Sequence, residues 1–280
     1  MIDTELRDRV RSIRWFHNID FGNGVVAEGG KSVDTLNYEA DLYYGSMTLK
    51  DRSLIDIGAW NGFMSIEAKR RGAARVLATD HFAWTTDLVG RPGFELARER
   101  LAPDVEDMVI DVPDLTVERV GQFDAVLFAG VFYHLFEAPR YMKQVSALAR
   151  HVMIVETQQD LLDVARPAMA YYPGTSLVDD PTNFWGPNPL LMANLLAEAG
   201  FKEIRYRPNR SHGRGVYLAF RDQASMAAMG FTERNPRDAA DNRWRDVSHE
   251  TGEVLVGMLA RSAPRTIANL IRFFRREPMK

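Results

Sequence analysis

The amino-acid sequence predicts an α/β fold, a doubly wound seven-stranded Rossmann-like sheet with an N-terminal helical segment and a C-terminal helical extension. Three observations support this prediction. Short apolar runs of strand length alternate with stretches of helical period. The segment Ser53-Leu-Ile-Asp-Ile-Gly-Ala-Trp-Asn-Gly-Phe-Met-Ser65 reads as a buried strand, a glycine turn and the start of a helix. The next apolar run leads to Asp80, which places an acid at the tip of the second strand.

The expected elements follow one another in a regular order. We expect helices at 1–14, 37–44, 63–71, 94–101, 139–149 and 188–199, and a loop at 81–86. We expect strands at 54–57, 75–78, 105–110, 123–130, 151–156, 201–207 and 216–221. A glycine-rich, hairpin-like turn at 211–215 joins the last two strands.

Composition narrows the class of protein. The 280 residues fit one α/β domain with appendages, and a hydrophobic share of 46% suffices for a large core. The formal net charge of −3 gives no overall basic field for nucleic acid. With no cysteine, disulfides, thiolate nucleophiles and Cys-ligated metals are excluded. The charged start lacks the apolar core of a signal peptide, and no apolar run reaches transmembrane length, so we expect a cytoplasmic protein.

Two glycines and two acids predict a ligand site after the first strand. Gly58 and Gly62 lack Cβ, so the backbone can turn sharply and a bulky ligand can approach it. Asp80 can accept hydrogen bonds from a ribose diol. Asp56 would repel the pyrophosphate that a G-x-G-x-x-G turn seats, and it suits instead a nucleoside that carries an ammonium group. The alternative is an ordinary βαβ unit whose glycines serve only the turn.

These residues resemble the first motif of the class I S-adenosylmethionine-dependent methyltransferases, an acid followed by three alternating glycines. The sequence departs from that motif at the middle glycine, where Trp60 stands. The Asp-Ile-Gly-x-x-Asn-Gly-Phe version is similar to a subgroup that includes tRNA wobble-uridine methyltransferase-like proteins and small-molecule O-methyltransferases. The resemblance spans residues 15–221 and implies a methyltransferase that uses S-adenosyl-L-methionine. The cofactor-binding residues that we expect are Asp56, Gly58, Gly62, Asp80, Asp111 and Gly130.

Two further segments resemble motifs of the same family. Asp111 follows the third strand, and the resemblance implies that it meets the adenine amino group; the alternative is a solvated loop acid. The run from Phe123 to His134 is similar to the fourth motif, which places Gly130 to His134 beside the transferred methyl group. A hydroxyl acceptor must lose a proton, and histidine titrates near neutral pH, so we expect His134 to be the catalytic base. Alternatively, His134 caps the following helix or orients the insertion that comes later in the chain.

Aromatic residues predict where the acceptor binds. Trp15-Phe16-His17 is similar to the segment that walls the cofactor and substrate cleft in the same subgroup, and packing of the N-terminal helix is an equal alternative. The aromatic stretch 157–189 reads as a substrate lid or as a packed surface loop. The substrate-binding residues that we expect are Trp15, His17, Tyr133, Tyr172 and Trp185. Weaker candidates for the base are Tyr133, His17, Glu156 and Asp179.

The sequence predicts that the chain is divided into three segments. They are an N-terminal helical cap and substrate wall at 1–45, a cofactor-binding methyltransferase domain at 46–222 that includes the insertion, and a helical extension at 223–280. In the extension, 235–245 is polar, and helices are expected at 253–259 and 266–276. The last twenty residues are basic and amphipathic. They suit a membrane surface, RNA or a partner helix, but a packing helix with a solvated basic face is favoured.

O-methylation of a small molecule, such as a sugar or a secondary metabolite, is the favoured function. The aromatic insertion and the acidic overall charge suit a compact neutral acceptor. A tRNA wobble-uridine-type methyltransferase and a non-catalytic cofactor-binding protein are the alternatives, and nucleic acid is disfavoured because the only basic concentration is the tail. Divalent metal binding is one interpretation of Asp179-Asp180, but two adjacent acids more often form a turn, so no metal is expected. The acceptor, the atom methylated and a homodimeric state are left open by the sequence.

Overall fold

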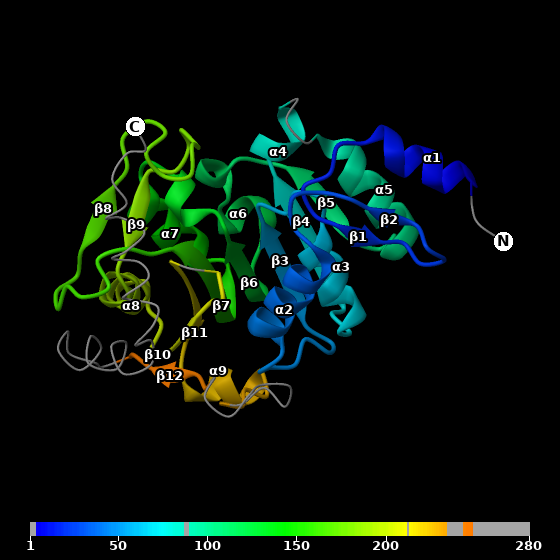
Figure 1. Ribbon diagram of the computed structural model, residues 1–280. Coiled ribbons are helices and arrows are strands. Elements are labelled where there is room, and N and C mark those ends of the chain that lie inside the picture. Colours follow the sequence, from blue (N-terminus) through cyan, green and yellow to red (C-terminus); the bar gives the residue numbers. More distant parts are fainter. Residues whose placement is uncertain (1–3, 87–89, 212, 234–242, 249–280) are drawn as a thin grey trace, which may run out of the picture.

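Figure 1 shows the computed structural model of the protein, in which a central sheet lies between helices. The structure describes residues 4–86, 90–211, 213–233 and 243–248. The main sheet has eight strands in the order β12-β10-β11-β7-β6-β3-β4-β5. Their bounds are β3 Ser53–Ile57, β4 Arg75–Asp80, β5 Glu106–Val109, β6 Phe123–Ala129, β7 Ala149–Gln158, β10 Glu203–Pro208, β11 Arg214–Phe220 and β12 Arg245–Asp246.

The seven predicted strands all form, and β12 adds an eighth at the edge next to β10. Strands β3 to β7 pair in parallel, whereas β11 runs antiparallel to both β7 and β10. Parallel strands present their carboxyl ends at one edge of the sheet, so the segments after β3, β4, β5, β6 and β7 meet there. The chain turns from one half of the sheet to the other between β3 and β6, and ligands of open α/β sheets bind at such a switch point.

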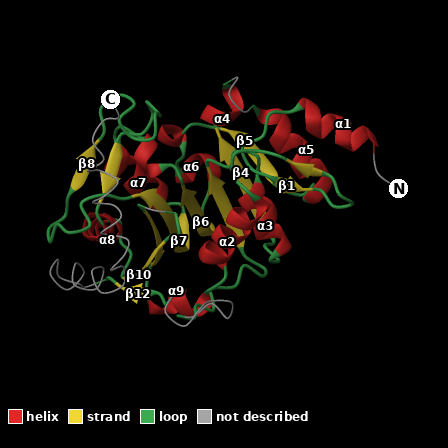
Figure 2. Cartoon of the chain, viewed as in Figure 1, coloured by secondary structure: helices red, strands yellow, loops and turns green. Residues whose placement is uncertain are grey.

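Helices cover both faces of the sheet (Figure 2). Successive strand residues point to opposite faces, so adjacent residues of β3 join different cores. Leu54 packs in one hydrophobic core and Ile55 packs in the other. The connecting helices are α3 Phe63–Arg70, α4 Phe82–Thr85, α5 Arg91–Leu101, η1 Val112–Asp114, α6 Val117–Val120, η2 Phe132–His134, α7 Ala138–Ser146 and α8 Pro189–Glu198.

The N-terminal segment lies on the face of the sheet that α3 and α5 also cover. Its elements are α1 Thr4–Ser12, β1 Ile19–Asp20, β2 Val26–Ala27 and α2 Val33–Tyr44. Leu6 and Val10 of α1 are buried in the same core as Leu36 of α2. Helix α2 begins at Val33 rather than at residue 37, because Ser32 caps it: the Ser32 hydroxyl accepts a hydrogen bond from Thr35 N at 3.2 Å.

Two segments that we expected to be irregular contain regular structure. The expected loop at 81–86 includes α4, whose first turn is held by Ala83 N donating to Asp80 Oδ1 at 2.9 Å. The insertion 157–189 includes a two-stranded antiparallel sheet, β8 Met169–Tyr171 and β9 Trp185–Pro187. Helix α7 ends at Ser146 and β7 begins at Ala149, so the expected helix at 139–149 is too long at its end.

Part of the predicted extension packs on the main sheet. Helix α9 Gln223–Ala228 contacts β7 and β11, and β12 pairs antiparallel with β10. Trp244 is 3% exposed, and its indole N–H donates to the Ser46 hydroxyl at 2.7 Å. The expected helices at 253–259 and 266–276, and the basic stretch that contains the second, lie outside the described residues.

Within the described ranges, none of the helices combines the length and the apolarity that crossing a membrane requires. In the same ranges, no group of three or more histidine, aspartate or glutamate side chains is placed to hold a metal ion.

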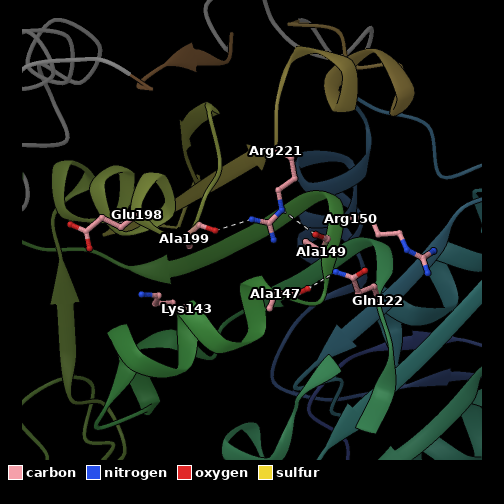
Figure 3. Close-up of a pocket in the computed structure, with 8 residues that line it drawn as sticks. All are labelled: Gln122, Lys143, Ala147, Ala149, Arg150, Glu198, Ala199 and Arg221. Carbon is pink, nitrogen blue, oxygen red and sulfur yellow. Dashed lines mark hydrogen bonds between the residues drawn. The ribbon is translucent and has the colours of Figure 1, made fainter. Parts of the chain in front are cut away.

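A cavity of about 590 Å³ opens at the amino ends of the parallel strands, at the edge opposite the switch point. Figure 3 shows Arg221 within it. Its guanidinium donates to the carbonyls of Ser146, Ala149 and Ala199 at 2.5, 3.1 and 2.8 Å. Ser146 ends α7 and Ala199 follows α8, so one cation satisfies the last carbonyls of two helices. Lys143 and Arg150 lie apart from one another in this view, so we assign the cavity no ligand.

Replacing Arg221 by methionine should lower the free energy of unfolding by about 2 kcal/mol, because hydrogen bonds from a charged donor are lost and water restores only part of them. Equilibrium urea unfolding measures this change. Arg150→Met is the matched control, because the Arg150 side chain lines the same cavity but is 52% exposed. The control should change stability by less than about 0.5 kcal/mol. Equal losses in both variants would contradict the capping role.

Candidate functional site

The turn after β3 has a backbone that requires glycine. Gly58 and Gly62 have φ angles of +83° and +80°. A Cβ on Gly58 would lie 2.7 Å from Val131 Cγ2, and one on Gly62 would lie 2.8 Å from the Phe94 ring. Trp60, which replaces the middle glycine of the family motif, also has a positive φ of 52°. The turn therefore keeps a left-handed conformation at a position where the side chain disfavours it.

Asp80 holds this turn from the end of the neighbouring strand β4. Its Oδ2 accepts a hydrogen bond from Trp60 N at 3.0 Å, and its Oδ1 accepts the one from Ala83 N. The backbone of the turn is also tied to β4, because Gly58 N donates to Thr79 O at 2.8 Å. Burial raises the pKa of Asp80, and the hydrogen bonds from Trp60, Ala83 and His81 oppose that shift.

Asp56 lies inside the fold beneath the turn. It is 3% exposed, and its Oδ2 accepts a hydrogen bond from the Ser65 hydroxyl of α3 at 2.6 Å. Burial is the main cause that raises its pKa to about 7; the Ser65 hydrogen bond opposes the shift and the nearby charge of Asp80 adds to it. Asp56 and Asp80 are thus two buried acids near the ends of neighbouring strands, and a cationic group beside them would favour their charged forms.

The structure brings Asp111 and Gly130 to the same edge of the sheet. Asp111 follows β5 and is exposed, and its Oδ1 accepts a hydrogen bond from Val112 N at 2.7 Å, which caps η1. The chain is tied to β4 just before Asp111, because Ile110 N donates to Asp80 O at 3.1 Å. Gly130 follows β6 and has a φ of +73°. Residues after β3, β4, β5 and β6 therefore surround one strand-end region.

His134 lies in the short helix η2 that follows Gly130, and the insertion holds its ring. His134 Nδ1 lies 3.0 Å from Thr182 O and 2.9 Å from Thr182 Oγ1. The ring packs on Tyr133, with 4.2 Å between the ring centroids. Burial lowers the pKa of His134; the hydrogen bond to Thr182 and the charge of Asp180 oppose that shift, and the charge of Arg214 adds to it.

Charged side chains gather beside Tyr133, and of these the sequence analysis selected only Glu156. Arg214 of β11 forms a two-point ion pair with Glu156 of β7, and its Nη2 donates to the Tyr133 hydroxyl at 3.1 Å. Glu156 has a side chain only 3% exposed and is committed to this pair, which argues against its weaker candidacy as a base. On α2, the equally buried Glu39 pairs with Lys31 at 2.5 Å. Burial raises the pKa of Glu39; its pairing with Lys31 and the charge of Arg214 oppose that shift, and the charge of Glu156 adds to it.

Asn61 joins the N-terminal segment to the glycine turn, and the sequence analysis missed its role. Its side chain is fully buried, and Oδ1 accepts hydrogen bonds from Phe16 N at 3.0 Å and His17 N at 3.1 Å. Its place in the Asp-Ile-Gly-x-x-Asn-Gly-Phe pattern was the available signal. Through Asn61 the turn fixes the backbone of two of the aromatic residues that precede it.

Trp15 and His17 lie at the inner side of this junction. Trp15 is 7% exposed, and its indole N–H donates to Val10 O at 2.9 Å, a placement that favours the packing alternative. His17 is also buried, next to Trp60 and Phe63. Burial, with a contribution from the charge of Lys31, lowers the pKa of His17 to about 3, so its ring is neutral at pH 7. That low pKa argues against His17 as a base.

The insertion carries the last two predicted residues. The Tyr172 hydroxyl donates to Asp160 Oδ2 at 2.5 Å, and the Trp185 indole N–H donates to Phe136 O at 3.1 Å. The insertion docks on η2 through its backbone, because Phe184 N donates to Tyr133 O at 2.9 Å. Trp185 therefore lies beside η2. Tyr172 turns instead to an acid within the insertion.

Asp179 and Asp180 form a turn, as favoured. Asp179 is exposed with a φ of 55°, and Asp180 Oδ1 accepts hydrogen bonds from Thr182 N at 2.8 Å and Thr182 Oγ1 at 2.6 Å. The two neighbouring acids thus differ: one is a surface residue, and the other is joined through Thr182 to His134.

Comparison with known proteins identifies the fold. No protein-family model matches the chain. A tRNA U34 carboxymethyltransferase of Haemophilus ducreyi is 26% identical over 162 residues, which are 56% of this chain and 47% of that protein. The ribosomal protein L11 methyltransferase of Thermotoga neapolitana is 27% identical over 124 residues, which are 43% of this chain and 44% of that protein. Each match thus spans less than half the length of the curated relative.

Solved structures share the arrangement of strands and helices. The N-terminal domain of EvdMO1, crystallised in the presence of SAH and D-fucose, has a TM-score of 0.56 at 20% identity, covering 79% of this chain and 96% of that one. Magnesium protoporphyrin IX methyltransferase (ChlM) from Synechocystis PCC 6803 with bound SAH has a TM-score of 0.50 at 19% identity, covering 68% and 83%. The chain has the Rossmann-like fold of the class I methyltransferases, which confirms the predicted fold class.

The raised pKa of Asp56 predicts a pH dependence of stability. A carboxyl whose pKa rises from 3.8 to about 7 on folding stabilises the protein fully below its unfolded pKa, and this contribution is lost as pH rises through 7. In Asp56→Asn the amide oxygen can still accept from Ser65, but the side chain no longer titrates. The free energy of unfolding of this variant should therefore fall by about 2 to 4 kcal/mol less than that of the wild type between pH 4 and pH 8. Urea unfolding at both pH values measures the difference. Parallel curves for the two proteins would contradict the buried, proton-binding Asp56.

Proposed function

We propose that this protein is an S-adenosyl-L-methionine-dependent methyltransferase that methylates a hydroxyl oxygen of a small molecule, such as a sugar or a secondary metabolite. One observation carries the proposal: a left-handed turn after β3 lies against a buried acid at the tip of β4, at the switch point of the sheet. Ligands of open α/β sheets bind at that point. The two curated relatives are named as a methyltransferase and a carboxymethyltransferase, and both matched structures were crystallised with SAH present.

The residues at the turn suit the cofactor. The Asp80 carboxylate accepts hydrogen bonds from the backbone of Trp60, Ala83 and His81, which orient it. A carboxylate has about four lone-pair sites, so Asp80 can still accept from a ribose hydroxyl. Asp111 offers an acceptor for the adenine amino group. Gly58, Gly62 and Gly130 supply backbone without a side chain at the strand ends. The charged form of Asp56 would attract the cationic methionine moiety of the cofactor, and that cation would in turn favour the charged form.

His134 is the base of this proposal. The bound cofactor supplies an electrophilic methyl group on a cationic sulfur. The chain supplies the orientation of the acceptor and the removal of its proton, which for a hydroxyl is best done by a group that titrates near neutral pH. Because Thr182 engages Nδ1, Nε2 is the nitrogen that would take the proton. Its lowered pKa means that the ring is already neutral, and so ready to accept, at pH 7.

Several observations support a small, hydroxyl-rich acceptor. Tyr133, Arg214 and Glu156 lie directly beside Gly130: a Cβ there would be 3.9 Å from both the Arg214 Nη2 and the Tyr133 hydroxyl. Together with the Lys31–Glu39 pair they offer donors and acceptors of balanced charge, which suit hydroxyl groups better than a strongly charged ligand. The EvdMO1 domain was crystallised in the presence of D-fucose, which is a sugar. His17 and Trp185 would border this acceptor site, and the insertion would act as its lid.

A tRNA wobble-uridine-type methyltransferase is the second candidate, favoured by the likeness to the tRNA U34 carboxymethyltransferase. The net charge of −3 opposes it, because RNA binding rests largely on cations that neutralise phosphates. Measuring tRNA binding at low and moderate salt separates the two candidates. Salt-sensitive tRNA binding would favour the second, and its absence the first. We place the enzyme in the cytoplasm under either candidate.

Isothermal titration with SAH tests the cofactor site. The wild type should bind SAH, and Asp80→Asn should bind it at least about tenfold more weakly, because a charge-assisted hydrogen bond to the ribose is lost. Asp114→Asn is the control, since the Asp114 side chain is 62% exposed in η1, and it should bind like the wild type. Circular dichroism checks that the variants fold. Preference of the wild type for NAD over SAH would contradict the proposal.

Substitution of His134 tests the base. His134→Ala should bind SAH within about twofold of the wild type while turnover falls by about 100-fold or more, because a general base contributes at least that factor. Methyl transfer to a panel of sugars and phenols measures turnover. His151→Ala, at the amino edge of the sheet where His151 lies near Ser225, should leave both quantities unchanged. Equal turnover of His134→Ala and the wild type would remove the histidine from its role.

A further inference from the structure

A chain of hydrogen bonds runs from the proposed base into the insertion. His134 Nδ1 lies within hydrogen-bond distance of both the carbonyl and the hydroxyl oxygen of Thr182, at 3.0 and 2.9 Å. The Thr182 hydroxyl in turn donates to Asp180 Oδ1 at 2.6 Å, and Thr182 N donates to the same oxygen at 2.8 Å. These contacts join residues 48 positions apart in the chain. The proposed function uses the contact on Nδ1 but gives no role to Asp180.

The chemistry of the partners decides where the protons lie. A carbonyl oxygen only accepts, so the contact with Thr182 O requires a hydrogen on His134 Nδ1. The Thr182 hydroxyl gives its single hydrogen to the Asp180 carboxylate and is left to accept from Nδ1. Both contacts therefore select the same tautomer, with the hydrogen on Nδ1 and the lone pair on Nε2. In neutral histidine this lone pair is the only one that can take a proton.

We propose that Thr182 and Asp180 are positioning residues for His134, which fix its Nδ1–H tautomer and stabilise the ring once Nε2 has taken the proton of the acceptor. This inference rests on the proposed function of His134 and adds two residues that act through it. In the step concerned, an oxygen lone pair of the acceptor forms the bond to the methyl carbon and the carbon–sulfur bonding pair returns to sulfur. The hydroxyl proton passes to Nε2 and leaves later to solvent.

The charges around His134 show why a carboxylate matters there. From β11, Arg214 disfavours a protonated ring, although Glu156 of β7 pairs with Arg214 and reduces this effect. From η2, Tyr133 stacks on the ring as a neutral group. Burial also disfavours the protonated form. Asp180 of the insertion is the carboxylate that acts in the opposite direction, so it supplies the compensation that a base needs in this setting.

The same contacts tie the base to the docked insertion. Phe184 N donates to Tyr133 O at 2.9 Å and Tyr172 N donates to Phe184 O at 2.9 Å, so the segment that follows Thr182 is held against η2 by its backbone. The His134 ring is therefore held in this orientation only while the insertion is docked on η2. A lid that also orients the base would couple closure over the acceptor to proton removal.

Nitrogen NMR of the histidine rings tests the proposal in protein without any ligand. The wild type should show His134 in the Nδ1–H tautomer. Asp180→Asn keeps an oxygen that can accept from Thr182 but removes the charge, so the pKa of His134 should fall by about half a unit or more. Asp179→Asn is the matched control, because Asp179 is the exposed neighbour, and it should leave the pKa unchanged. An Nε2–H tautomer in the wild type, or equal pKa values in the two variants, overturns the proposal.

Kinetics provide the second measurement. The acid limb of the kcat/KM profile should move to lower pH in Asp180→Asn, with kcat reduced by about tenfold and KM little changed. Thr182→Val removes the hydroxyl and should lower kcat similarly, whereas Thr182→Ser should restore it. An unmoved acid limb, or no rescue by serine, overturns the positioning role. Failure of the proposed function is distinguishable, because it would appear as absence of methyl transfer by the wild type whatever the NMR tautomer.

Discussion

The hydrogen bond between Trp60 N and the Asp80 carboxylate is the constraint on which the site depends. It joins the turn after β3 to the tip of β4 and sets the backbone that a ligand would meet. A non-glycine residue in the left-handed region costs about 1 kcal/mol, whereas a hydrogen bond to a charged group contributes about 1.5 to 3 kcal/mol. The bond thus offsets the strain at Trp60, and the same carboxylate then faces the switch point of the sheet.

The proposed acceptor half of the site depends on a different kind of constraint. Gly130, Tyr133 and His134 come from one short segment, but their orientation is set by partners from distant parts of the chain. Arg214 holds the Tyr133 hydroxyl and Thr182 holds the His134 ring. Glu156 is buried and Arg214 is partly buried, so the desolvation of this pair is costly, and its presence beside Gly130 is consistent with a role in orienting groups rather than in adding stability.

The sequence predicted what local patterns determine. Apolar runs and glycine turns located all seven expected strands and the turn with Asp56 and Asp80, because strand period and positive φ leave local signatures. It did not predict the partners of Asn61, Arg214 or Thr182, which lie 45, 58 and 48 residues from the groups they bind. Such pairs follow from strand order and insertion docking, which no local pattern encodes. Aromatic composition likewise did not decide whether Trp15 packs inward or faces a cleft.

The central claim is that the strand tips of β3 and β4 hold a sulfonium nucleoside. A crystal structure of the protein with SAH tests this claim most directly. We predict that the ligand lies at the turn after β3, with its ribose hydroxyls donating to the Asp80 carboxylate and its sulfur on the side of Gly130 and His134. A ligand bound elsewhere, for example in the cavity around Arg221, or a ribose that faces away from Asp80, would contradict the account.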